Sequence, residues 1–336
     1  MMDEVELQGS SLQITRLGFG CARLMARIGR RDSVRLLRGA YDAGITHFDT
    51  ARLYGYGEAE SALGDLIASV GRNRVTVATK FGILPPRRTP LLSAAKSAAR
   101  VVARLHPSTR AVFRRRAASM TRASAFDTAT ARASVEASLR ALRTDRIDLL
   151  LLHECTPDDL TDELLMFVEG LHRAGTIRAH GIATKPDHAA EVLRRHPAFA
   201  LVVQTVSSVW EPAAERLAAV GGGFALITHS ALGAPFLALC ERLAARPETA
   251  RRWSEALGID SLDQSALAGL VLAASVSDNP RGAVVFSAAS EAKIAANARA
   301  AGTAHALSAA APRIEALRAL LRGNEAAVAQ AEARGG

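Results

Sequence analysis

Cysteine is scarce in this sequence, and the few cysteines lie far apart. Three occur among 336 residues, at Cys21, Cys155 and Cys240, and none has the spacing of a metal-ligand motif. A disulfide framework is therefore excluded, and such isolated thiols are typical of a reducing compartment. We expect no metal site.

Targeting and membrane-spanning signals are also missing. The N-terminal stretch MMDEVELQGS is acidic and polar, unlike a secretory signal. The longest apolar run, ALAGLVLAASV at residues 266–276, is too short to cross a bilayer. The composition, 49% hydrophobic and 22% charged, provides enough apolar material for a full core. These properties predict a cytoplasmic protein without a transmembrane segment.

One long segment lacks acidic residues altogether. The net charge of the chain is +9, yet residues 84–125 contain ten basic residues and no Asp or Glu, so the rest of the chain sums to −1. Within this segment, residues 93–105 place Lys96, Arg100 and Arg104 on one helical face, as in a basic amphipathic helix. The basic residues are Arg87, Arg88, Lys96, Arg100, Arg104, Arg110, Arg114, Arg115, Arg116 and Arg122.

Four interpretations of this basic segment remain open. It is a lid that attracts an anionic substrate, a dock for an acidic partner, a membrane-surface contact through residues 93–122, or a solvated loop. Nucleic acid is not an expected partner, because Phe113 is the only aromatic residue of the stretch and bases would have no stacking platform.

Outside that segment, short apolar runs alternate with helical patterns. Strand-like runs centre near residues 18, 47, 77, 150, 180, 202, 226 and 285, and helical patterns follow them. Eight such units in one chain predict a (β/α)8 TIM barrel. The alternative, a doubly wound nucleotide fold, needs a glycine-rich fingerprint after its first strand, and GFGCARLMARIG lacks the third glycine.

We therefore predict one barrel domain over residues 1–336. A hairpin over residues 5–18 precedes the first barrel strand, where it can plug the N-terminal end of the barrel. The basic segment forms a long insertion, about residues 84–128, after the third strand. The Ala- and Leu-rich residues 307–334 form a final outer helix.

Polar residues stand at the ends of three consecutive predicted strands, where such barrels carry their chemistry. Asp49 ends the second strand and Tyr54 lies in the loop that follows, within DTARLYGYGEAE. Lys80 ends the third strand and His153 ends the fourth. Period-two alternation places Lys80 on the face of Thr76 and Ala78, and His153 on the face of Ile147, Leu149 and Leu151.

These four residues suit proton delivery to a carbonyl group that is being reduced. A phenol has a pKa of about 10, which a nearby ammonium lowers, and a carboxylate can hold that ammonium in place. We expect Lys80 to lower the pKa of Tyr54, and His153 to orient or polarise a carbonyl oxygen. A purely structural interpretation also exists, in which Lys80 pairs with Asp49 and His153 is a capped core histidine.

At this point the sequence resembles the aldo-keto reductase superfamily. The matching stretches, from about residue 16 to 300, are GITHFDTARLYGYGEAESALGDLI, VTVATKFG, SLRALRTDRIDLLLLHE, GTIRAHGIAT and KIAANARA. The resemblance implies that Asp49, Tyr54, Lys80 and His153 are the catalytic tetrad of the family. It also implies a barrel that binds NAD(P)H, with hydride passing from the nicotinamide to a carbonyl carbon while Tyr54 donates the proton.

The same resemblance implies a set of cofactor-binding residues. Gln204 matches the glutamine that holds the carboxamide, whereas Ala183 and Thr184 stand where the family has serine and asparagine. His229 replaces a stacking tyrosine, with Ser230 beside it as a phosphate contact. On the adenine side, the implied residues are Ser287, Lys293 and Asn297, at a helix N-terminus that suits a phosphate.

Lys293 stands where the family often has an arginine for the 2′-phosphate, which favours NADP(H) over NAD(H). Its alternative is a solvated lysine on a helix. The resulting hypothesis is an NADPH-dependent oxidoreductase that reduces an aldehyde or ketone to an alcohol, or catalyses the reverse oxidation, on a small carbonyl or alcohol substrate. The alternative is a non-catalytic NADP-binding, redox-sensing regulatory subunit that acts through its basic insertion.

Overall fold

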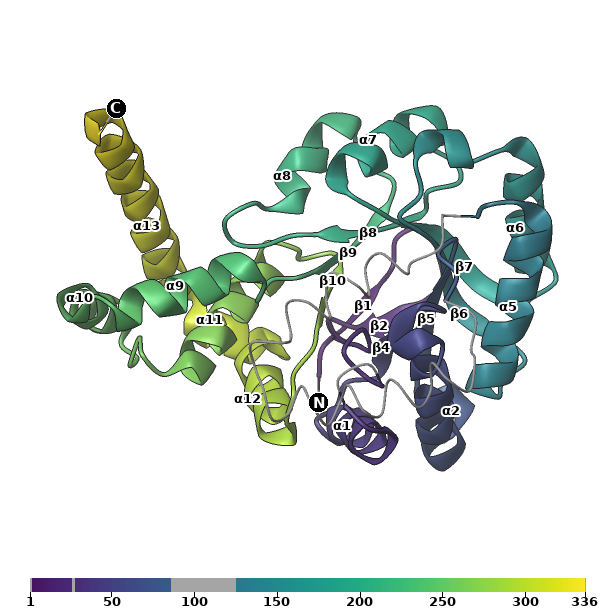
Figure 1. The fold of residues 1–336 in the computed structure, drawn as a ribbon, viewed down its shortest axis with the longest axis horizontal. Helices are drawn as coiled ribbons and strands as arrows, with labels where there is room; N and C mark the ends of the chain where they lie inside the picture. The colour runs from purple at the N-terminus through teal and green to yellow at the C-terminus, as the bar shows by residue number, and fades with distance from the viewer. Residues whose placement is uncertain (1, 26–27, 86–124, 336) are drawn as a thin grey trace.

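Eight parallel strands close into a barrel in the computed structural model, which describes residues 2–25, 28–85 and 125–335. Each strand pairs with the next along the chain, and the last, β10, closes the ring against β3 (Figure 1). The predicted (β/α)8 barrel is confirmed. The barrel strands are β3 (Leu17–Gly20), β4 (His47–Asp49), β5 (Thr76–Phe81), β6 (Ile147–His153), β7 (Ile177–Ala183), β8 (Val202–Val206), β9 (Ala225–His229) and β10 (Ala283–Phe286).

Helices surround this barrel, most of them against the outer face of its strands (Figure 1). They are α1 (Arg30–Asp42), α2 (Ala59–Val70), α5 (Thr128–Leu142), α6 (Asp162–Arg173), α7 (Pro186–Arg195), α8 (Ala213–Leu217), α9 (Ala234–Ala244), α10 (Pro247–Leu257), α11 (Gln264–Ser277), α12 (Glu291–Ala301) and α13 (Ala304–Gly335). The predicted final outer helix is present as α13, and its main contacts are with α10, α11 and α12. Its C-terminal half projects away from the barrel on the side of α9 and α10 (Figure 1).

The strands bury both faces, and the alternation of their side chains separates two apolar cores. The larger core lies between strands and helices and contains Phe48, Val77 and Leu150. The smaller core fills the barrel interior with residues such as Ala78 and Leu151. Leu149 and Leu151 share one face, as predicted, and that face is the barrel interior. Ile147, predicted on the same face, packs in the outer core instead.

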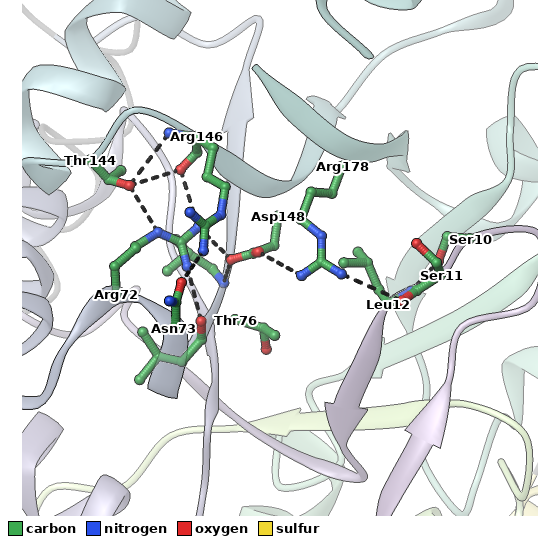
Figure 2. A network of polar contacts seen from close by, with 12 residues as sticks. Ser10, Ser11, Leu12, Arg72, Asn73, Thr76, Thr144, Arg146, Asp148 and Arg178 are labelled. Atoms are coloured by element: carbon green, nitrogen blue, oxygen red, sulfur yellow. Dashed lines mark hydrogen bonds and ion pairs between the residues drawn. The ribbon is translucent and has the colours of Figure 1, made fainter. Parts of the chain in front are cut away.

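The predicted N-terminal hairpin is present and plugs the barrel. Strands β1 (Glu4–Glu6) and β2 (Gln13–Thr15) pair antiparallel, and Leu7, Leu12 and Ile14 pack with the interior core. At this end of the barrel the buried Asp148 accepts hydrogen bonds from Arg72 and Arg178 (Figure 2). The Arg178 guanidinium also donates to the Ser11 carbonyl at 3.5 Å, which ties the hairpin to the barrel.

The insertion after β5 begins and ends at neighbouring points of the fold. The Ala125 N–H donates to the Gly82 carbonyl at 2.8 Å, and the Phe126 ring contacts that of Phe81 with centroids 6.1 Å apart. The predicted basic helix at 93–105 and the proposed contact segment 93–122 lie outside the described residues. Within the described ranges, no helix has the length and apolarity needed to span a membrane.

Candidate active site

The four residues singled out in the sequence lie together at the C-terminal end of the barrel. Asp49 and His153 are the last residues of β4 and β6, Lys80 is the penultimate residue of β5, and Tyr54 begins a short 3-10 turn, η1 (Tyr54–Tyr56). Lys80 Nζ lies 2.5 Å from Asp49 Oδ1 and 5.1 Å from the centroid of the Tyr54 ring. The rings of Tyr54 and His153 meet edge to face, with centroids 5.8 Å apart.

Glycine allows the loop to present Tyr54 in this place. Gly55 has a φ of +59°, and a Cβ on it would lie 2.6 Å from the Cβ of Met25 and 2.9 Å from the Leu24 carbonyl oxygen. The loop after β3 therefore packs directly against the backbone that follows Tyr54. Gly57 also has a positive φ, +82°, as the chain turns into α2, and such conformations favour glycine.

Asp49 is buried and holds Lys80 as its counter-ion. Burial alone raises the pKa of the Asp49 carboxyl, but the Lys80 charge and the hydrogen bonds from Lys80 and Gln204 bring that pKa below its usual value. Burial likewise lowers the pKa of Lys80, and the Asp49 charge more than offsets this effect, so the Lys80 pKa is raised. Lys80 also donates to the Thr50 carbonyl at 3.0 Å. The pair is therefore ionised near neutral pH.

The pKa of Tyr54 is raised overall, although Lys80 acts to lower it as expected. Burial raises the pKa of the Tyr54 phenol, and the nearby Asp49 charge adds to this effect. Lys80 lowers this pKa through its charge and a hydrogen bond, but the net shift is upward. Tyr54 is thus a protonated phenol at neutral pH, poised beside an ammonium group.

His153 is neutral in this site. Burial lowers its pKa to about 3, and the adjacent Lys80 charge acts in the same direction. Its Nδ1 is buried without a hydrogen-bond partner among the described residues. A neutral imidazole can hydrogen-bond a carbonyl oxygen without adding a charge to the site.

Two residues implied for the carboxamide end of a cofactor have other partners here. The Thr184 hydroxyl donates to the Cys155 carbonyl at 2.8 Å, so its proton is already used. Gln204 Nε2 donates to Asp49 Oδ1 at 2.8 Å, which leaves its carbonyl oxygen as the free group. Ala183 contributes no polar side chain. Gln204 therefore belongs to the same hydrogen-bonded cluster as Asp49 and Lys80.

His229 and Ser230 stand at the end of β9, on the same end of the barrel. His229 Nδ1 lies 2.8 Å from Ser230 Oγ, and Ser230 adopts a positive φ of 69°. Burial lowers the pKa of His229, so this imidazole is neutral as well. Its charge interactions with Asp49 and Lys80 place it near the tetrad.

The implied adenine-side residues follow β10. Ser287 is half-buried just past the strand, Lys293 is exposed in the first turn of α12, and Asn297 is buried one turn later. The Ser290 hydroxyl accepts a hydrogen bond from the Lys293 N–H at 3.4 Å and caps the helix. Glu291, beside them, forms an ion pair with Arg35 at 3.0 Å. Serine hydroxyls, a lysine and a helix N-terminus are suitable groups for a phosphate.

Sequence reasoning missed a buried carboxylate behind the tetrad. Glu60, in the first turn of α2, is fully buried and lies 2.5 Å from Arg52 Nη1. It also accepts hydrogen bonds from Thr79 at 2.7 Å and Ser138 at 2.6 Å. A signal was available, because Glu60 falls on the same helical face as Leu63 and Ile67, an apolar face where a carboxylate needs partners.

No group of three or more His, Cys, Asp or Glu side chains in the described part of the chain is arranged to hold a metal ion. The chemistry available at the barrel mouth is therefore that of a phenol, an ammonium, a carboxylate and neutral imidazoles. Such a set can donate a proton to, and hydrogen-bond, an oxygen atom that gains negative charge.

Solved structures with this architecture include a glycerol dehydrogenase of Gluconobacter oxydans. It superposes with a TM-score of 0.63 over 93% of this chain and 95% of that one, at 19% identity. An aldo-keto reductase of Bacillus halodurans superposes with a TM-score of 0.61 over 94% of this chain and 96% of that one, at 22% identity. These likenesses concern the fold.

Sequence comparison adds the family. D-threo-aldose 1-dehydrogenase of a Pseudomonas species is 30% identical over 185 residues, 52% of this chain and 51% of that protein. The chain spans between 22% and 56% of the length of curated relatives that it matches. The profile of the aldo/keto reductase family matches residues 16–311. Because that match covers most of the sequence, the chain belongs to the aldo/keto reductase family.

Proposed function

We propose that this protein is an NADPH-dependent oxidoreductase that reduces an aldehyde or a ketone to an alcohol, or catalyses the reverse oxidation. The observation that carries the proposal is the position of the Tyr54 ring, between the Lys80 ammonium at 5.1 Å and the His153 ring at 5.8 Å. A phenol beside a fixed cation and a neutral imidazole is a proton donor for a carbonyl oxygen.

Each side chain has a distinct task in this proposal. Asp49 holds the Lys80 ammonium at 2.5 Å, and Lys80 stabilises the phenolate that forms as Tyr54 gives up its proton. His153, neutral because burial lowers its pKa to about 3, hydrogen-bonds the carbonyl oxygen and orients it. Bound NADPH supplies the hydride for the carbonyl carbon.

The residues present fit a nicotinamide dinucleotide. At the carboxamide end, the free oxygen of Gln204 accepts a hydrogen bond from the carboxamide, while the His229 ring offers a face for stacking. At the other end, Ser287, the start of α12 and the exposed Lys293 suit phosphate groups. Lys293 would favour the additional 2′-phosphate of NADPH over NADH, and Asn297 would contact the adenine.

The substrate class follows from the relatives rather than from the pocket. The names of two of them, an aldose dehydrogenase and a glycerol dehydrogenase, indicate small polyhydroxylated substrates for those proteins. For this chain we propose a small aldehyde, ketone or sugar as substrate. A single barrel unit performs both cofactor binding and chemistry in this proposal.

Two measurements test the proposal. Titration with NADPH, followed by cofactor fluorescence, should show saturable binding, and a panel of aldehydes, ketones and sugars should reveal NADPH consumption. The Tyr54→Phe variant should bind NADPH with nearly unchanged affinity but lose carbonyl reduction. If turnover survives in Tyr54→Phe, the proton donor is misassigned. If wild-type protein binds NADPH and reduces nothing in the panel, the regulatory alternative takes its place.

A further inference from the structure

A second buried carboxylate, that of Glu60, lies among residues next in sequence to the tetrad. Glu60 has no exposed side-chain surface, and its carboxylate contacts residues of three different elements. One oxygen accepts from Thr79 on β5 and Ser138 on α5, at 2.7 and 2.6 Å. The other lies 2.5 Å from Arg52 in the loop between β4 and α2.

Two of these contacts adjoin tetrad residues along the chain. Arg52 precedes Tyr54 by two residues, and Thr79 immediately precedes Lys80. Because side chains alternate along a strand, Lys80 points into the barrel while Thr79 points outward to α2. The Arg52 N–H also donates to the Lys80 carbonyl at 3.4 Å. Glu60 therefore connects the strand that carries Lys80 with the loop that carries Tyr54.

The Arg52 guanidinium is well placed to hold this loop. Its side chain is only 17% exposed, and one of its nitrogens lies 3.9 Å from the position that a Cβ on Gly57 would occupy. Gly55, next to Tyr54, packs against Met25, and the Gly57 N–H donates to the Tyr54 carbonyl at 3.0 Å. The loop that carries Tyr54 is thus held by contacts at Gly55 and at Gly57.

We propose that Arg52 and Glu60 form a positioning pair, which sets the distance of the Tyr54 hydroxyl from Lys80 and His153. This inference rests on the proposed reductase function for its kinetic consequence. The geometry matters because proton transfer and hydride transfer need reacting groups in place, and a displacement of about 1 Å costs on the order of 100-fold in rate.

The critical variant is the double substitution Arg52→Met with Glu60→Gln. Arg52→Met alone keeps the apolar stem but leaves a buried carboxylate without its cation, which endangers folding. Glu60→Gln removes that charge and keeps an oxygen that accepts from Thr79 and Ser138. If the pair serves only stability, the double variant should therefore keep both its fold and its rate. If the pair positions Tyr54, the double variant should keep its fold but lose rate. The single variant Arg52→Lys, which keeps a cation opposite Glu60, should retain more of the wild-type rate than the double variant does.

Arg30→Met is the matched control. Arg30, the first residue of α1, forms an exposed ion pair at 2.5 Å with Asp65 of α2, the helix that also carries Glu60. It also donates to Ser61, but among the described residues no hydrogen bond or ion pair joins it to the Tyr54 loop or to β5. Its removal should leave kcat, KM and the affinity for NADPH within about twofold of wild type, as expected for a surface pair.

The experiment measures thermal unfolding, NADPH affinity, kcat, KM and the titration of Tyr54 by NMR of its ζ-carbon. We expect the double variant to fold and bind NADPH like wild type, with kcat at least about tenfold lower, KM nearly unchanged and a shifted Tyr54 titration. An unchanged kcat together with an unchanged Tyr54 titration overturns the inference. If wild type shows no turnover but the Tyr54 titration still shifts in the double variant, the reductase proposal fails and the positioning pair stands.

Discussion

Buried carboxylates hold cations at both ends of the barrel, and the networks of Asp148 and Asp49 are built differently. At the N-terminal end, Asp148 accepts from Arg72 at 2.6 Å, from Arg178 at 3.3 Å and from the Val77 N–H at 2.8 Å. Arg72 further donates to the Val75 and Arg146 carbonyls at 3.0 and 3.1 Å (Figure 2). Each carboxylate oxygen of Asp148 and each guanidinium nitrogen of Arg72 has a partner in the protein.

At the C-terminal end, the cation is a lysine. Lys80 divides its ammonium between Asp49 and the Thr50 carbonyl and faces the Tyr54 ring, while His153 Nδ1 lacks a partner among the described residues. Arginine, with a rigid fork and a permanent charge, joins backbone segments, whereas the compact lysine ammonium can bias a neighbouring proton. In this molecule, the carboxylate saturated by arginine is the one expected to serve stability, and the carboxylate paired with lysine is the one beside the proposed proton donor.

Replacing the cation at the C-terminal end should have the largest effect. Lys80→Met removes the charge that lowers the pKa of Tyr54, and leaves Asp49 buried without a counter-ion. We expect kcat to fall by about 10²- to 10⁴-fold, with NADPH affinity much less affected, as measured by single-turnover NADPH oxidation. Arg72→Met, the equivalent change at the other end, should leave the turnover of the folded molecules near wild type. Equal rate losses in the two variants would contradict the assignment.

Removing the carboxylate at the N-terminal end should instead reduce stability. Asp148→Asn leaves Arg72, whose side chain is only 15% exposed, without a carboxylate partner, and breaking a buried pair costs about 3 kcal/mol or more. Denaturant unfolding should show this loss in the free energy of unfolding. The kcat of the protein that remains folded should stay within about twofold of wild type, so a large change in kcat would show that the two networks are coupled.

Some features of these sites could be predicted from the sequence, and others could not. Strand alternation was enough to group Lys80 with Ala78, and His153 with Leu149 and Leu151, because a period of two is a local property of the chain. The raised pKa of Tyr54 was not predictable, since it depends on how completely surrounding segments bury the phenol. The contacts of Glu60 with Arg52, Thr79 and Ser138 join segments up to 78 residues apart, and only tertiary packing determines them.

Each end of the barrel also holds a buried histidine, His47 at the N-terminal end and His153 at the mouth, and both should affect stability in acid. Burial lowers the pKa of His47, at the start of β4, to about 4. Its folded pKa lies below the unfolded value of about 6.5, so its contribution to stability is complete above that pH and is lost as the pH falls toward 4. In His47→Gln, the loss of unfolding free energy between pH 6.5 and pH 4.5 should be smaller than in wild type by about 2 kcal/mol.

The acid titration needs a functional control. His47 lies 3.2 Å from Thr76 Oγ1 at the end of the barrel away from Tyr54, so His47→Gln should keep the wild-type kcat at pH 7. His153→Gln, at the mouth, should lower kcat at that pH as well as reduce the acid sensitivity. If His47→Gln proves as acid-sensitive as wild type, the histidine is already charged in the folded protein.

The smallest expected effect is a change in the pH dependence of the rate, and it is specific for the barrel mouth because it reports the single proton of Tyr54. Burial raises the pKa of Tyr54, so the phenol is protonated over the neutral range. In the proposed reaction, carbonyl reduction needs that proton, so its rate should fall about tenfold per pH unit once the pH exceeds the Tyr54 pKa. Alcohol oxidation needs the phenolate, so its rate should rise about tenfold per pH unit until the pH reaches that pKa. Measured in both directions on one substrate pair, the two profiles should therefore bend at high pH with opposite slopes. Asp148→Asn should leave the bend in place, since its network is at the opposite end of the barrel, whereas Lys80→Met should move it to higher pH. A bend that moves with Asp148 and not with Lys80 would assign the proton to a different group.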